Sequence, residues 1–136
     1  MIYKIIMIHN SLQKKVEILK KHFNNYCLIL SSCLENINHS FKIYKSFIEE
    51  LVNNNSNKLL DTFIISVLKY EEYIMNGDDE FFLGNNYDDY KDNRIKVFEF
   101  KSIWTSLSEE NKNVIKSYMK ILCQIARKYF DLLYEN

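Results

Sequence analysis

The sequence predicts an all-α fold, a single domain over residues 1–136 that is built as a bundle of five or six helices. The 136 residues include no proline and only two glycines, so the turn residues that a strand-rich fold needs are absent. Hydrophobic residues make up 47% of the chain, which is enough for a core, and a chain of this length is typically one domain.

A first helix is expected after a short N-terminal segment. Residues 1–9 are apolar and β-branched, and they form either an extended arm or a first helical turn. The apolar residues that follow recur at spacings of four, three and four, which predicts a helix with one buried stripe. The segment 26–37 either continues this helix or begins another near Asn24. The stripe consists of Leu12, Val16, Leu19 and Phe23.

Two further helices are expected in the middle of the chain. The first, over 41–52, has a broad apolar face, is opened by His39 and Ser40, and ends at a cluster of asparagines. Ser56 suits the start of the next, because a serine oxygen can accept a hydrogen bond from a free N–H of the first turn. This helix, over 56–75, is apolar on most sides, and we expect it at the centre of the bundle.

The last third of the chain predicts the longest regular helix. Ser108 is a strong N-cap for a helix that runs to Tyr134, and two glutamates in its first turn suit the helix dipole. Its seam alternates spacings of three and four over about 26 Å. We expect it to pack with the 56–75 helix, and Trp104, the only tryptophan, to be buried beside them. The seam residues are Ile115, Tyr118, Leu122, Ile125, Tyr129 and Leu132.

Charge is balanced overall but unevenly spread. The net charge of zero argues against a dedicated nucleic-acid binder, which usually has a strong basic excess. Residues 1–58 carry eight lysines and four glutamates, whereas residues 71–92 carry eight acids and one lysine. Four N-terminal lysines either form a solvated helix surface, which we favour, or contact phosphates or anionic lipid. They are Lys14, Lys15, Lys20 and Lys21.

The acidic segment 77–93 has no helical pattern and is expected to be a loop. It does not fit an EF-hand, because placing Gly84 at the centre puts Phe81 and Leu83 at ligand positions. Its aromatic residues predict either a partner-binding loop or, for Phe81 and Phe82, side chains that pin the loop to the core. The expected partner-binding residues are Phe81, Phe82, Leu83, Tyr87 and Tyr90.

The sequence contains no recognisable catalytic motif. The two glycines stand seven residues apart, which excludes a Gly-rich phosphate loop. The odd number of cysteines, all in apolar runs, indicates buried reduced thiols in an intracellular protein. No uncharged run reaches 18 residues, so no transmembrane helix is expected. One group of metal-ligating residue types has a spacing that matches no usual zinc motif: His22, Cys27, Cys33 and His39.

Composition and one local pattern point to a viral relative. The chain has 17 isoleucines and 16 asparagines but one alanine, which indicates an AT-rich genome of a large DNA virus, a protist or a bacterium. Ile103 and Trp104, the Ser-Glu-Glu-Asn break and the helix around Tyr118 resemble a C-terminal pattern of uncharacterised helical proteins of giant and other large DNA viruses. Lys116 stands where that pattern usually has a second tryptophan. Bcl-2-like poxvirus proteins are similar in length and helix content only.

These observations together predict a non-enzymatic interaction or structural protein of a large DNA virus, with no metal and no cofactor. It would bind a protein partner or a second copy of itself through helical surfaces and the acidic aromatic loop, and would not act at a membrane. The alternative is a small component of a nucleoprotein assembly that contacts nucleic-acid phosphates through the four N-terminal lysines.

Overall fold

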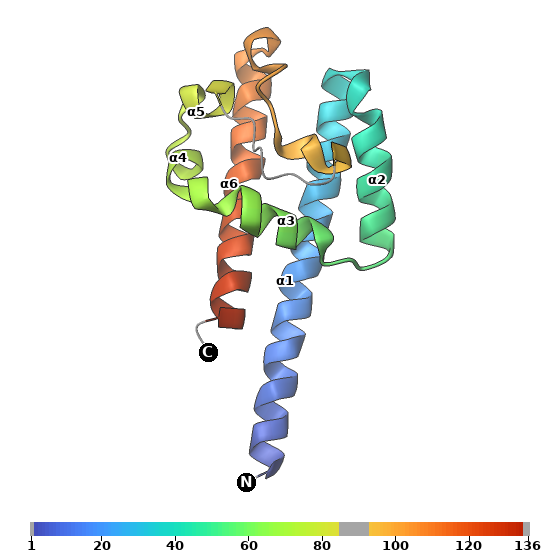
Figure 1. Cartoon of the computed structure of the whole chain (residues 1–136), viewed down its shortest axis with the longest axis vertical. Helices are drawn as coiled ribbons and strands as arrows, with labels where there is room; N and C mark the ends of the chain where they lie inside the picture. The colour runs from blue at the N-terminus through green and yellow to red at the C-terminus, as the bar shows by residue number, and fades with distance from the viewer. Residues whose placement is uncertain (1, 85–92, 135–136) are drawn as a thin grey trace.

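The structure is a computed structural model that describes residues 2–84 and 93–134. These residues form six α-helices and four 3₁₀ helices with no strand, so the predicted all-α bundle is confirmed (Figure 1). Their buried side chains make one hydrophobic core. The elements are α1 (Ile2–Ile37), η1 (His39–Phe41), α2 (Lys42–Asn53), α3 (Lys58–Ser66), η2 (Leu68–Tyr70), α4 (Glu71–Asn76), α5 (Asp79–Gly84), η3 (Asn93–Phe98), η4 (Trp104–Ser106) and α6 (Glu109–Tyr134).

The first helix, α1, is continuous over 36 residues. The described part of residues 1–9 is therefore helical, and no second helix begins near Asn24. The Asn24 side chain is buried, and its Nδ2 donates a hydrogen bond to the backbone oxygen of Ser56 at 3.3 Å. An asparagine that meets a distant backbone oxygen in this way does not need to end the helix. The helix ends before Asn38, whose extended backbone and side-chain oxygen start η1.

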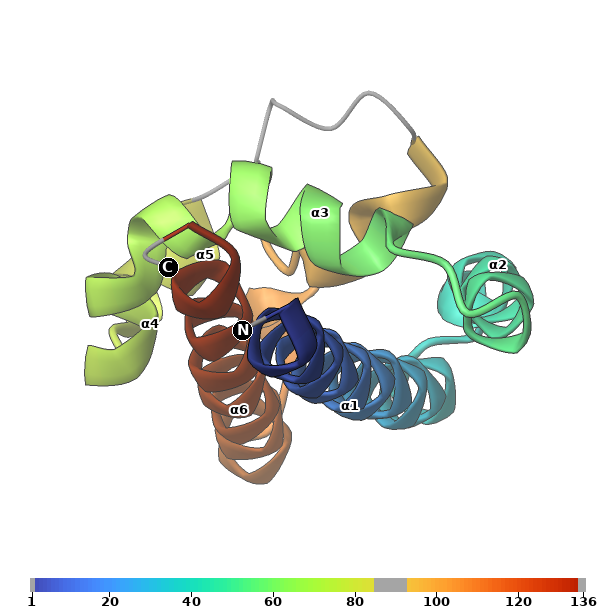
Figure 2. The same cartoon turned by 90° about the horizontal axis from the view of Figure 1, so that it is seen from below.

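The centre of the molecule is the antiparallel pair of α1 and α6, which lie side by side in both views (Figures 1 and 2). We expected the 56–75 helix and the C-terminal helix to form the centre. That expectation is wrong for the 56–75 helix, because α1 takes its place beside α6. Both long helices carry apolar stripes at alternating spacings of three and four, and these stripes face each other. The buried residues are Phe23, Cys27, Leu30 and Leu34 on α1, and Ile115, Met119, Leu122, Ala126 and Tyr129 on α6.

The helix expected over 56–75 is divided into α3, η2 and α4. Ser56 starts α3 as predicted, because its Oγ accepts a hydrogen bond from the N–H of Lys58 at 3.1 Å. A run of β-branched residues at the end of α3 disfavours a continued helix. The break lets α3 cross α1 and α6, while α4 turns along α6 (Figure 1). There the Arg127 Nη2 lies 3.1 Å from Glu71 Oε1.

The start of α6 follows the sequence prediction closely. The Oγ of Ser108 accepts a hydrogen bond from the N–H of Asn111 at 3.1 Å, which confirms the N-cap. Trp104 is only 2% exposed, also as predicted, although it lies in a single 3₁₀ turn. None of the described helices combines the length and the apolar character that crossing a bilayer requires.

Candidate functional site

The acidic segment 77–93 begins with a turn and a short helix. Gly77 ends α4 in the left-handed conformation, with φ of 68°, which favours glycine. The Asp78 Oδ1 then accepts a hydrogen bond from the N–H of Glu80 at 2.9 Å and starts α5. This turn brings α5 against α4 at the edge of the bundle, next to α6 (Figure 2). The loop expectation thus does not hold for 79–84.

The five predicted partner-binding residues have different environments. Phe82 is 2% exposed and stacks on Trp104, with ring centroids 4.8 Å apart and planes 10° apart. This burial fits the alternative interpretation, in which Phe82 pins the segment to the core. Phe81 is half-buried, and Leu83 is 41% exposed. The other two predicted residues, Tyr87 and Tyr90, lie outside the described residues.

Tyr73 of α4 joins this surface although the sequence placed it at the end of a core helix. Its ring stacks on that of Phe81, with centroids 5.9 Å apart and planes 5° apart, and Tyr73 is 54% exposed. The helical spacing indicates this exposure, because Tyr73 directly precedes the buried Ile74 and therefore points about 100° away from it around the helix. We call the following residues the acidic aromatic face: Glu72, Tyr73, Asp78, Glu80, Phe81 and Leu83.

One acid of this segment is held by α6. The carboxylate of Asp79 forms an ion pair with the ammonium of Lys116. The hydrogen bond from Lys116 lowers the pKa of Asp79 from its usual value, so this acid stays ionised. The pair fixes the start of α5 against α6. Glu72, Asp78 and Glu80 are also exposed, and Glu72 and Glu80 directly precede Tyr73 and Phe81 in the chain.

The four N-terminal lysines do not form one surface. Lys14, Lys15 and Lys21 are exposed on α1. Lys20 is only 5% exposed, and its Nζ donates a hydrogen bond to Glu17 Oε1 at 3.1 Å. That bond lowers the pKa of Glu17, which keeps the pair charged. Three of the four lysines are therefore exposed to solvent, and the fourth is buried.

The histidines and cysteines are not brought together. His22 and His39 are exposed, whereas Cys27 is buried and Cys33 half-buried. Burial raises the pKa of the Cys27 thiol well above its ordinary value and that of Cys123 to about 12. Within residues 2–84 and 93–134, no group of three or more His, Cys, Asp or Glu side chains could hold a metal ion.

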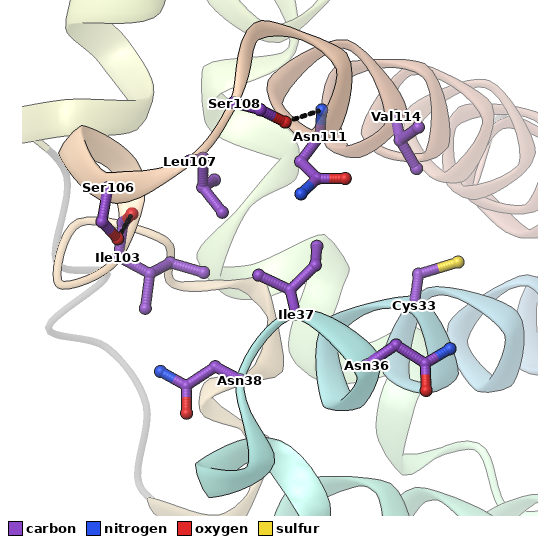
Figure 3. A pocket seen from close by; sticks show the side chains of 10 residues that line it. All are labelled: Cys33, Asn36, Ile37, Asn38, Ile103, Ser106, Leu107, Ser108, Asn111 and Val114. Carbon is purple, nitrogen blue, oxygen red and sulfur yellow. Dashed lines mark hydrogen bonds between the residues drawn. The ribbon is translucent and has the colours of Figure 1, made fainter.

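A pocket of about 670 Å³ lies between the end of α1 and the start of α6 (Figure 3). Ile37 points from the end of α1 toward Leu107 and Asn111 on the opposite wall. Amides, hydroxyls, aliphatic side chains and the Cys33 thiol line the pocket, with no charged residue among them. Such a lining offers hydrogen bonds to a neutral polar group, and Cys33 is its one thiol. The pocket was not predicted from the sequence, because its two walls are about 70 residues apart in the chain.

Neither protein-family models, nor curated proteins, nor solved structures match this chain. Its proposed function therefore depends on the geometry and the charges of the surfaces described above.

Proposed function

We propose that this protein is a non-enzymatic interaction or structural protein that binds a protein partner through its acidic aromatic face. The observation that supports the proposal is the stack of Tyr73 on Phe81, which leaves Tyr73 54% exposed beside Leu83 at 41%. Exposed aromatic side chains that already have a fixed orientation are typical of residues that dominate the binding free energy at interfaces.

Core residues fix the acidic aromatic face in place, which favours binding. Phe82 lies in the core against Trp104, so the backbone of α5 cannot move away without exposing both rings. Phe81 also contacts Tyr70, with ring centroids 5.4 Å apart. Aromatic side chains fixed in this way lose little conformational entropy when a partner covers them.

The acidic residues around the face define the chemistry of the partner. Glu72, Asp78 and Glu80 are exposed, and residues 71–92 carry eight acids against one lysine. Repulsion disfavours an acidic partner by several kcal/mol at close approach, whereas a partner with lysine or arginine beside apolar side chains is attracted. We therefore propose a basic, partly apolar protein surface as the partner.

The proposal is tested by the mass of the native assembly that the protein forms in its source, compared with its mass alone. The double variant Tyr73→Ser and Leu83→Ser should reduce the assembly mass to that of the isolated chain. The matched control is Ile43→Ser with Ile65→Ser, because these isoleucines are 69% and 68% exposed elsewhere on the molecule. An assembly that survives the first double variant would contradict the proposal.

A role in a nucleoprotein assembly is the second candidate, and the exposure of Lys14, Lys15 and Lys21 supports it. Salt distinguishes the two by degree, because contacts to phosphate release counterions and weaken steeply with salt, whereas salt screens the charges at the protein interface but leaves its apolar contacts. Assembly that is lost between about 50 and 200 mM salt would favour the nucleic-acid role.

The setting of the protein is also a proposal. We propose that it acts inside a cell, in host cytoplasm or a virion, and that its source is a large DNA virus. Three free cysteines suit a reducing compartment, and the codon-biased composition suits such a genome. A disulfide in the protein isolated from its source would contradict the intracellular setting.

A further inference from the structure

The N-terminal part of α1 extends beyond the rest of the bundle. In Figure 1 the helix continues below the end of α6, and no other element lies beside it there. Residues 2–11, which we call the overhang, are all exposed. Six of them are large and apolar, with exposed fractions between 49% and 83%: Ile2, Tyr3, Ile5, Ile6, Met7 and Ile8.

The overhang is apolar on every side. At 100° per residue, Ile5 continues the buried stripe of Val16, while Met7 lies on the opposite side, in line with Ile18. Ile6 and Ile8 occupy the two flanks. A helix that docks on one soluble surface needs a single apolar stripe, whereas a helix that is apolar all round needs apolar surroundings on all sides.

Basic residues accompany the overhang. Residues 1–23 contain five lysines and one glutamate, a balance of +4. Lys14, Lys15 and Lys21 are exposed on the turns that follow, and Lys4 lies within the overhang itself. A second copy that paired its own overhang here would bring two such charges together. The partner that the charge complements is anionic.

The length of the overhang suits insertion into the outer layer of one leaflet of a lipid bilayer. The apolar part, residues 2–8, is about 10 Å long at 1.5 Å per residue, and interfacial helices bury their apolar side about 5–10 Å deep. The segment is too short to span a bilayer. Long lysine side chains on the next turns can reach lipid phosphates, and tyrosine is enriched at this depth.

We propose that the overhang inserts into the boundary between the headgroups and the acyl chains of an anionic lipid bilayer, with Lys14 and Lys15 on the lipid phosphates. The proposal concerns only the surface of a bilayer, because none of the described helices is long and apolar enough to span one. The proposal does not depend on the acidic aromatic face, since α5 lies toward the other end of the molecule (Figure 1).

Co-sedimentation of the full chain with vesicles tests the proposal. We expect binding to phosphatidylcholine vesicles that contain phosphatidylserine, and binding about tenfold or more weaker to phosphatidylcholine alone. The double variant Ile5→Glu and Met7→Glu should lower binding at least tenfold, because it places charge in the inserted segment. The control Ile43→Glu with Ile65→Glu alters equally exposed isoleucines and should leave binding unchanged.

Three outcomes would overturn the proposal. One is the absence of binding to anionic vesicles. Another is that the protein does not bind vesicles but forms an oligomer in solution, and that the variant Ile5→Glu with Met7→Glu dissociates this oligomer. That result would identify a second copy as the occupant. The third is binding to a single-stranded oligonucleotide but not to vesicles. Circular dichroism should show unchanged folding in the double variant, because Ile5 and Met7 are 66% and 67% exposed.

Discussion

Trp104 connects the surface segment α5 to the core. Its ring stacks on Phe82 and lies under the ammonium of Lys112, which is 5.8 Å from the ring centroid. Its Nε1 is buried and has no hydrogen-bond partner among the described residues. A buried polar group without a partner costs free energy, which the burial and the stacking of the indole ring offset.

Replacing Trp104 with alanine should lower the free energy of unfolding by about 3–5 kcal/mol, because a buried ring leaves a cavity. Trp104→Phe should cost less than half as much, since it keeps most of the stack and removes the unpaired N–H. Urea unfolding followed by circular dichroism measures both. Equal losses in the two variants would show that stacking on Phe82 contributes little.

The cysteines predict a simple pattern of labelling. Burial keeps Cys27 and Cys123 as thiols at neutral pH, because it raises the pKa of both, and the thiolate is the reactive form. A thiol reagent should therefore modify one site in the native protein, the half-buried Cys33, and three in urea. Cys33→Ser should abolish native labelling. Rapid modification of Cys27 or Cys123 would contradict this.

At the scale of the helices, the ends of α4 and α5 determine how the acidic aromatic face is presented. Gly77 adopts φ of 68° and lets the chain reverse, and Asp78 begins the next helix. The only described non-glycine residue with positive φ is Asn55, in the turn between α2 and α3, and asparagine tolerates this conformation. Both turns thus use residues that suit them.

Gly77→Ala should lower the free energy of unfolding by about 1–2 kcal/mol, because the left-handed conformation strains any side chain with a Cβ. Crowding adds little, since the nearest atom to the new Cβ is Lys120 Nζ at 3.7 Å. Gly84→Ala is the matched control: among the described residues its Cβ meets no atom within 4 Å, and φ is not positive. That variant should be up to about 1 kcal/mol more stable. Thermal unfolding of both variants tests the difference.

At the scale of the whole molecule, the two ends of the chain supply its longest helices and pack against each other. α1 contributes its middle and last part to this contact, and the overhang contributes nothing to the core. The last two turns of α6 do contribute, through buried Tyr129 and through the ion pair of Arg127 with Glu71. The two ends of the molecule should therefore differ in their tolerance to truncation.

Deletion of residues 2–9 should change the free energy of unfolding by less than about 1 kcal/mol, since these side chains are exposed. Deletion of 127–134 removes Tyr129 and should cost more than about 3 kcal/mol. Urea unfolding of both truncated chains distinguishes them. A large loss on deleting 2–9 would mean that the overhang stabilises the bundle, which the structure does not indicate.

Local rules were sufficient for much of the fold. Ser108 and Ser56 act within one helix, so capping preferences predicted them. The predicted seam of α6 is confirmed for Ile115, Leu122 and Tyr129, whereas Tyr118, Ile125 and Leu132 are half-buried beside the buried Met119 and Ala126. The acidic aromatic segment was also located from the sequence. The division between its buried and exposed rings was not predictable, because it depends on Trp104, which is more than 20 residues away in the chain.

By itself, the sequence determined that the chain is helical, where its strongest helix begins, and which residues are apolar. Only the tertiary structure decided that α1 continues through Asn24, that the 56–75 helix breaks, and that Tyr73 is exposed while Phe82 is buried. The reason is range: capping and periodicity act over one or two turns. The contacts of Asn24 with Ser56 and of Glu71 with Arg127 join residues 32 and 56 positions apart.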